Sequence, residues 1–154
     1  MEFGEIEARG LVLLGCGKMG SAMLQGWLSA GLPPASVTVI DPKPSDWVQG
    51  TGVAITSDLP ASPAVVVVAV KPQMVGDALP VLMAMGGGGT VFLSVAAGTT
   101  LATFEGMLGG NTPIIRAMPN TPAAVGRGIT ALIGNAAVSS EVLDLGERLL
   151  SVVG

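Results

Sequence analysis

The chain has 154 residues, of which 49% are apolar and only 12% are charged, and its net charge is −4 at pH 7. Its seven basic residues form no cluster, which argues against nucleic acid and membrane surfaces as partners. The apolar run at residues 64–70 is far shorter than the roughly 20 residues that cross a bilayer, and the acidic N-terminus is unlike a signal peptide. We therefore expect a cytoplasmic protein with a single domain over residues 1–154.

The first predicted element is an apolar strand at residues 11–14, which runs into the G-x-G-x-x-G pattern of residues 15–20. In a dinucleotide-binding turn, Gly15 allows the sharp exit, Gly17 lets the backbone approach the phosphates, and Gly20 allows close packing of helix and strand. Residues 21–28 then carry an apolar stripe at helical spacing, and the N-terminus of that helix favours an anion. The alternative is an ordinary tight turn between a strand and a helix.

The rest of the chain alternates strands and helices. The seven valines and alanines of residues 64–70 suit a central strand that is buried on both sides, and Pro80 predicts a break in the helix that follows. The predicted strands after the first are residues 37–40, 53–55, 65–70, 90–95, 114–118 and 129–133. The predicted helices after the first are residues 71–85, 101–108 and 141–150.

This alternation predicts an α/β fold: a doubly wound, mainly parallel Rossmann-type sheet with helices on both faces. Ligands of such sheets bind at the carboxyl ends of the strands, near the switch point, which we place between the strands at 11–14 and 65–70. We expect five strand exits to border one crevice. They are residues 15–20, 41–43, 69–72, 96–98 and 118–121.

Four motifs together resemble pyrroline-5-carboxylate reductase. They are Gly-Cys-Gly-Lys-Met-Gly-Ser-Ala at 15–22, Ala-Val-Lys-Pro-Gln at 69–73, Ser-Val-Ala-Ala-Gly at 94–98 and Arg-Ala-Met-Pro-Asn-Thr-Pro at 116–122. The first motif is shared by many nucleotide-binding families, whereas the second and the fourth are much more specific. The resemblance implies reduction of Δ1-pyrroline-5-carboxylate to L-proline by hydride transfer from NAD(P)H.

The resemblance also implies site residues. Asn120 and Thr121 would lie near the nicotinamide and the substrate as the catalytic positioning pair. Thr56 or Ser57 would reach the adenine side. The cofactor would contact Leu14, Gly15, Cys16, Gly17, Lys18, Met19 and Gly20 with its pyrophosphate, Asp41, Pro42 and Lys43 with its ribose, and Ala69, Val70, Lys71, Pro72, Ala96, Ala97 and Gly98 with the remainder.

The residue inventory is compatible with this reaction. The chain contains no histidine and no tyrosine, which excludes dehydrogenases that use either residue as acid or base. A cyclic imine can bring its own proton, so the protein mainly has to position two reactants. Without histidine, and with Cys16 as the single cysteine, neither a Cys/His metal site nor an internal disulfide is possible.

Three residues near the predicted site have more than one interpretation. Lys71 could donate a proton, contact a phosphate or simply be solvated, and we favour the backbone of residues 69–72 as the contact. Arg116 could pair with a substrate carboxylate, extend to solvent or form a structural ion pair. Asn120 belongs to a Pro-Asn-Thr-Pro segment that is also a common turn sequence.

Two residues near the predicted ribose site point to different cofactors. Asp41 stands where an acidic residue accepts the ribose 2′-hydroxyl of NAD, yet Lys43 could neutralise the 2′-phosphate of NADP. The resemblance favours NADPH, with NADH as the second possibility.

Members of the family continue into a helical domain of about a hundred residues, which forms much of the substrate pocket and the homo-oligomer interface. We expect this chain to be a fragment that lacks that domain. Two alternatives are a nucleotide-binding module without activity and an NAD(P) domain of the β-hydroxyacid dehydrogenase type.

Overall fold

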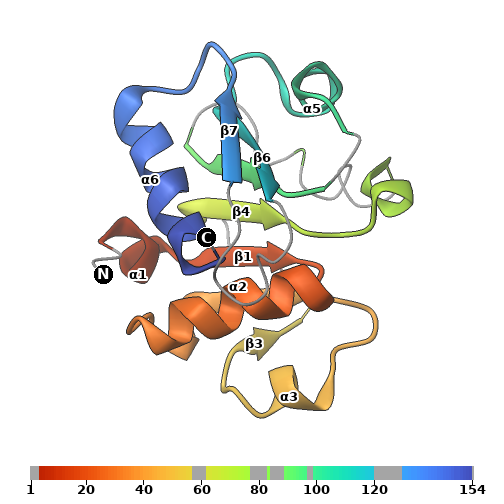
Figure 1. Cartoon of the computed structure of the whole chain (residues 1–154), viewed down its shortest axis with the longest axis vertical. Helices are drawn as coiled ribbons and strands as arrows, with labels where there is room; N and C mark the ends of the chain where they lie inside the picture. The colour runs from red at the N-terminus through yellow and green to blue at the C-terminus, as the bar shows by residue number, and fades with distance from the viewer. Residues whose placement is uncertain are drawn as a thin grey trace.

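The computed structural model describes residues 4–56, 62–76, 83, 89–96, 99–119 and 130–153. Its centre is a seven-stranded sheet with the order β3-β2-β1-β4-β5-β6-β7 (Figure 1). The strands are β1 (Leu11–Leu14), β2 (Val37–Ile40), β3 (Ala54–Ile55), β4 (Val65–Val68), β5 (Val91–Ser94), β6 (Ile114–Pro119) and β7 (Thr130–Gly134).

The first six strands are parallel, and β7 pairs antiparallel with β6. Chain order reverses at β1, which pairs with β2 on one side and with β4 on the other. The doubly wound, mainly parallel sheet predicted from the sequence is therefore confirmed, with its switch point between β1 and β4. The carboxyl ends of β2, β1 and β4 therefore lie side by side, with about 5 Å between neighbouring strands.

Helices cover both faces of the sheet, in two apolar layers. On one face, α2 (Lys18–Ser29) and α6 (Ser140–Leu150) lie against the side chains of Leu11, Leu13, Val65 and Val67, and Figure 1 shows these two helices in front of the sheet. On the other face, α5 (Leu101–Leu108) buries Phe104 and Leu108 against Val12, Val66 and Phe92. The continuous burial of β1 and β4 follows from this coverage.

Several boundaries differ from the sequence prediction. Strand β4 ends at Val68, and the next two residues, Ala69 and Val70, lie against the glycine turn at Gly15. The predicted helix at residues 71–85 begins as a 3-10 turn, η2 (Pro72–Met74), and most of its remaining length lies outside the described residues.

The sequence prediction missed three short elements in the first fifty residues. Helix α1 (Glu5–Arg9) holds Ile6 in the core, η1 (Pro34–Ser36) leads into β2, and α3 (Asp46–Gln49) follows β2 with Ser45 as its N-cap. The Arg9 guanidinium fixes α1 to the amino edge of the sheet by donating to the carbonyl oxygens of Ser62, Pro63 and Gly89. Only tertiary contacts of this kind explain such short helices.

The C-terminal segment is part of the same core. The buried Trp27 of α2 donates from its indole N–H to the carbonyl oxygen of Leu149, at 2.8 Å, near the end of α6. The 3-10 turn η5 (Ser151–Val153) then packs Val152 against Gly26 of α2. None of the helices in the described part of the chain is long and apolar enough to cross a membrane.

Candidate functional site

The predicted strand exits lie along one edge of the sheet. Since β1, β2, β4, β5 and β6 are parallel, their carboxyl ends point the same way. Residues 14–20, 41–43 and 69–72, together with Ala96 and Met118, therefore lie along that edge. Ala97, Gly98, Asn120 and Thr121 were also predicted as site residues, as was the weaker candidate Ser57, and these lie outside the described residues.

The turn after β1 requires glycine at its first and last positions. Gly15 has a φ of +86°, and a Cβ there would lie 3.0 Å from the carbonyl oxygen of Ala69. A Cβ on Gly20 would lie 2.6 Å from the carbonyl oxygen of Gly15. The two outer glycines thus let the strand turn sharply and let α2 start against the end of β4.

Gly17 is different, because it faces open space. It is exposed, and a Cβ on it would meet no described atom within 4 Å. It is also the N-cap of α2 and has no side chain with which to cap the first-turn N–H groups. A twelve-residue helix therefore presents its positive end beside an open glycine, and this geometry fits a diphosphate.

Asp41, the first residue after β2, joins two of the exits. Its Oδ2 accepts the backbone N–H of Cys16 at 2.8 Å, and its Oδ1 accepts the backbone N–H of Lys43 at 2.8 Å. The carboxylate is half-buried, and hydrogen bonds to an ionised acceptor are among the stronger ones in proteins. The glycine turn and the turn after β2 are thereby held together.

Cys16 is buried within the glycine turn, as expected for a small packed residue. Its Sγ lies 3.5 Å from the hydroxyl oxygen of Ser21, which itself donates to the carbonyl oxygen of Cys16 at 3.1 Å. Burial is the main cause that raises the pKa of the thiol above its ordinary value; the hydrogen bond with Ser21 lowers it, and the negative charge of Asp41 makes the smallest contribution, which raises it. Cys16 is therefore a neutral packing residue at neutral pH.

The exits of β4 and β5 present mainly backbone and small side chains. The N–H of Ala69 donates to the carbonyl oxygen of Leu14 at 2.8 Å, which extends the β1–β4 ladder to the edge. Lys71 is exposed, and its carbonyl oxygen accepts the N–H of Met74, the last residue of η2. At the end of β5, the buried Ser94 accepts the N–H of Ala96 with its hydroxyl oxygen.

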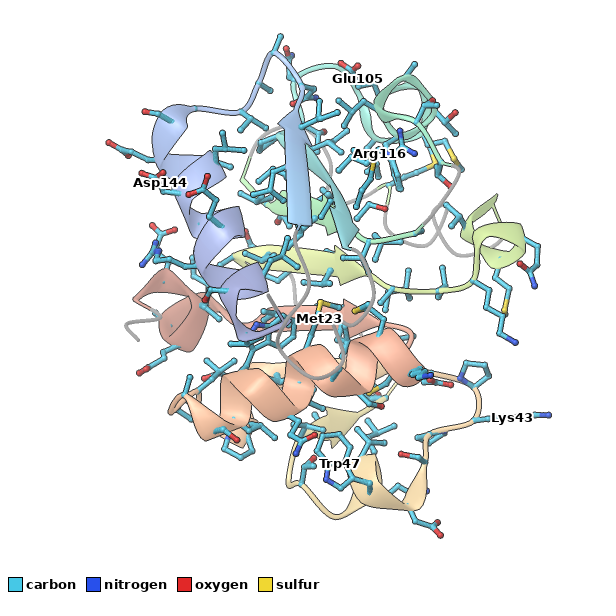
Figure 2. All side chains as sticks on the ribbon, viewed as in Figure 1. Met23, Lys43, Trp47, Glu105, Arg116 and Asp144 are labelled. Carbon is cyan, nitrogen blue, oxygen red and sulfur yellow. The ribbon has the colours of Figure 1, made fainter. Side chains whose placement is uncertain are left out.

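Arg116 lies inside β6, opposite Ser94 of β5 and Ile133 of β7. Alternation along the strand places it on the face covered by α5, and Figure 2 shows it close to that helix. Its Nε is buried and has no hydrogen-bond partner, and no ion pair of Arg116 is found among the residues that the structure describes. The structural ion pair considered from the sequence is thus not seen there.

Two features of the site were missed by the sequence prediction. The bridging role of Asp41 had no signal beyond the position of an acidic residue about twenty residues after the glycines. The hydroxyl of Ser21, which closes the glycine turn on itself, had no signal other than its place after Gly20.

Within the described ranges, no group of three acidic or cysteine side chains is arranged to hold a metal ion.

Comparison with known proteins gives a consistent result. A family model described as NADP oxidoreductase coenzyme F420-dependent matches residues 10–98. The pyrroline-5-carboxylate reductase of Pseudomonas aeruginosa is 31% identical over 150 residues, which cover 94% of this chain and 55% of that protein. The chain spans about half the length of the curated relatives that it matches.

Solved structures agree with this similarity. A pyrroline-5-carboxylate reductase from Coxiella burnetii superposes with a TM-score of 0.87 at 30% identity, over 95% of this chain and 57% of that one. A pyrroline carboxylate reductase from Plasmodium falciparum, with NADP bound, superposes with a TM-score of 0.82 at 26% identity, over 96% of this chain and 56% of that one. The resemblance inferred from the four motifs is confirmed.

Proposed function

The chain belongs to the family described as NADP oxidoreductase, coenzyme F420-dependent, and we propose that it is the dinucleotide-binding part of a pyrroline-5-carboxylate reductase. The observation that carries the proposal is the similarity to such reductases over 94% of the chain, at 31–35% identity. An NADP-bound relative of the same fold supports NAD(P) as the cofactor.

The described residues fit that cofactor. The open Gly17 and the first-turn N–H groups of α2 would hold the diphosphate, and the turn at residues 41–43 would receive the adenosine ribose. The backbone of residues 69–72 and 96–98 would line the path to the nicotinamide. We propose Asn120 and Thr121 as the residues that position the nicotinamide and the substrate.

The proposed reaction is reduction of the C=N bond of Δ1-pyrroline-5-carboxylate. NAD(P)H, when bound, supplies the hydride that is added to the imine carbon. The imine nitrogen carries its own proton, so the product is a secondary amine and no side chain has to act as acid. The task that remains for the protein is orientation of the two reactants, which agrees with the absence of histidine and tyrosine from the sequence.

We propose NADPH as the preferred cofactor, with NADH as the second. All three lysines of the sequence follow the adjacent strands β1, β2 and β4, as Lys18, Lys43 and Lys71, and all three are exposed. Figure 2 shows Lys43 extending away from the molecule at this edge. Three cations at one edge of an acidic protein favour the more highly charged of the two dinucleotides.

Two measurements on the 154-residue chain test the proposal. Calorimetric titration with NADPH is expected to show binding, and oxidation of NADPH in the presence of pyrroline-5-carboxylate is followed by absorbance. Binding together with turnover supports a reductase that is active as this chain. Binding without turnover supports the alternative, a nucleotide-binding module that needs further residues for activity. Absence of binding to both NADPH and NADH would overturn the proposal.

We propose that the whole protein to which this chain belongs is a homo-oligomer. The exposed apolar side chains of Met118 and Ile133, on the neighbouring strands β6 and β7, support this.

A further inference from the structure

We propose that Asp41 is a positioning residue that holds the phosphate turn and the ribose turn of the site in one arrangement, and that its charge does not select against NADP. The proposal rests on the proposed function, since it concerns how this chain binds a dinucleotide. It gives Asp41 a different role from the one that its position in the sequence suggests.

The evidence is the pair of hydrogen bonds made by the carboxylate. One oxygen accepts the N–H of Cys16, in the middle of the glycine turn, and the other accepts the N–H of Lys43, two residues further along its own turn, both at 2.8 Å. The glycine turn contains a left-handed residue, Gly15. A bridge from a neighbouring strand exit limits the conformations open to such a turn before any ligand arrives.

The same bridge reduces the cost of placing a phosphate nearby. In dinucleotide folds, a carboxylate at the end of the second strand accepts the ribose 2′-hydroxyl, and it repels a 2′-phosphate. Here two backbone N–H dipoles face the carboxylate oxygens, and the exposed ammonium of Lys43 belongs to the same turn. The carboxylate oxygens of Asp41 therefore face backbone N–H groups, and these groups together with Lys43 partly balance its negative charge.

The two roles differ in what they predict for cofactor preference: one predicts a shift toward NADPH, and the other predicts no shift. If Asp41 were a selective ligand of the ribose 2′-hydroxyl, its removal would weaken NADH binding and strengthen NADPH binding. If it positions the turns, its removal weakens both cofactors by a similar factor. The ratio of the two dissociation constants therefore separates the roles, whatever the loss of affinity for either one.

The experiment measures binding of NADPH and NADH to the 154-residue chain by calorimetry, for the wild type, Asp41→Ala, Asp41→Asn and Asp46→Asn. We expect Asp41→Ala to weaken both cofactors by about tenfold or more, the factor that corresponds to one charged hydrogen bond. The ratio of the NADPH and NADH dissociation constants should stay within about threefold of the wild type.

Two further variants test the cause of the loss. Asp41→Asn, which keeps one acceptor oxygen, should lose less affinity than Asp41→Ala. Asp46→Asn changes an exposed acid of the neighbouring α3 that has no hydrogen bond to the described residues of the glycine turn, and this charge-matched control should change little.

Cys16 provides a readout that needs no cofactor. It is the single cysteine of the chain, its side chain is buried in the glycine turn, and its N–H is one end of the bridge. Asp41→Ala removes the bridge and loosens the turn around the thiol, so alkylation at a fixed alkaline pH should be faster than in the wild type, whereas Asp46→Asn should not change it. An unchanged alkylation rate in Asp41→Ala would mean that the bridge does not hold the glycine turn in solution, and it would contradict the proposal.

The failures of the two proposals are distinguishable. A wild-type chain that binds neither dinucleotide overturns the proposed function and this inference with it. A wild-type chain that binds, combined with a shift of more than about tenfold toward NADPH in the Asp41 variants, overturns the positioning role alone.

Discussion

Two glycines at the start of α2 have different roles: Gly17 is expected to matter for binding, and Gly20 for stability. Gly17 faces open space, so Gly17→Ala should cost only the modest stability that is lost when alanine replaces glycine at an N-cap, while it obstructs the approach of the diphosphate. Gly20→Ala would push a Cβ into the Gly15 carbonyl, and we expect it to cost about 1–3 kcal/mol, the range for overpacking. Thermal unfolding and NADPH calorimetry measure the two effects. Gly106→Ala, at an open position of α5, is the control. A stable Gly17→Ala variant that binds as well as the wild type would contradict the assignment.

The thiol of Cys16 should be slow to react at neutral pH. Its pKa is raised, chiefly by burial, so the reactive thiolate forms only at a pH above the ordinary thiol range. The rate of alkylation by a neutral reagent, measured from neutral to strongly alkaline pH under native conditions, should have its midpoint above that of a free cysteine. A midpoint at or below the value for free cysteine would show that the turn is open to water.

Contacts between individual residues were the part of the site that the sequence predicted least well. The conformational demands on Gly15 and Gly20 followed from their spacing after a strand, because close packing at that junction is a local requirement. The bridge of Asp41 did not, because it depends on the register between β1 and β2, which brings Gly15 opposite the end of β2. The burial of the Arg116 Nε, which has no hydrogen-bond partner among the described residues, depends in the same way on which face of β6 is covered.

At the scale of elements, the contact between α2 and α6 is expected to contribute substantially to stability. Trp27→Phe removes the indole donor and leaves the Leu149 carbonyl oxygen without it, which should cost about 1–3 kcal/mol. Trp47→Phe is the matched control, because Trp47 is 43% exposed on α3 and should change stability by less than about 0.5 kcal/mol. Urea unfolding followed by far-UV circular dichroism measures both. Equal effects of the two substitutions would contradict the role given to this contact.

The strands were predictable for a simple physical reason. Runs such as Val65–Val68 are β-branched and apolar on both faces, which only a strand covered on two sides can accommodate. Helices α1 and α3 were not predictable, because five and four residues cannot form a helix without tertiary support. The sequence of β7 also did not indicate that this strand is antiparallel, because its side chains alternate between the two faces of the sheet in either orientation.

At the scale of the whole molecule, charge is distributed unevenly. The three lysines follow β1, β2 and β4, whereas Glu141, Asp144 and Glu147 lie on α6, and Figure 2 shows Lys43 and Asp144 on opposite sides of the molecule. Such an arrangement directs an anionic ligand toward the carboxyl edge of the sheet.

This distribution predicts a salt dependence. Raising the ionic strength from about 0.01 M to about 0.15 M shortens the screening length from about 30 Å to about 8 Å. The affinity for NADPH should therefore fall more than the affinity for NADH, because NADPH carries the additional phosphate. Calorimetry at both ionic strengths measures the difference, and Lys43→Ala should reduce it. Equal losses for the two cofactors would argue against recognition of the 2′-phosphate by these lysines.

The central claim is that a dinucleotide binds across the carboxyl ends of β2, β1 and β4, with its diphosphate on the glycine turn. A crystal structure of the chain with NADP tests it most directly. The account predicts density for the diphosphate beside Gly17 and the first turn of α2, and density for the ribose beside residues 41–43. Density for the nucleotide at the amino edge of the sheet, near Arg9, would contradict it.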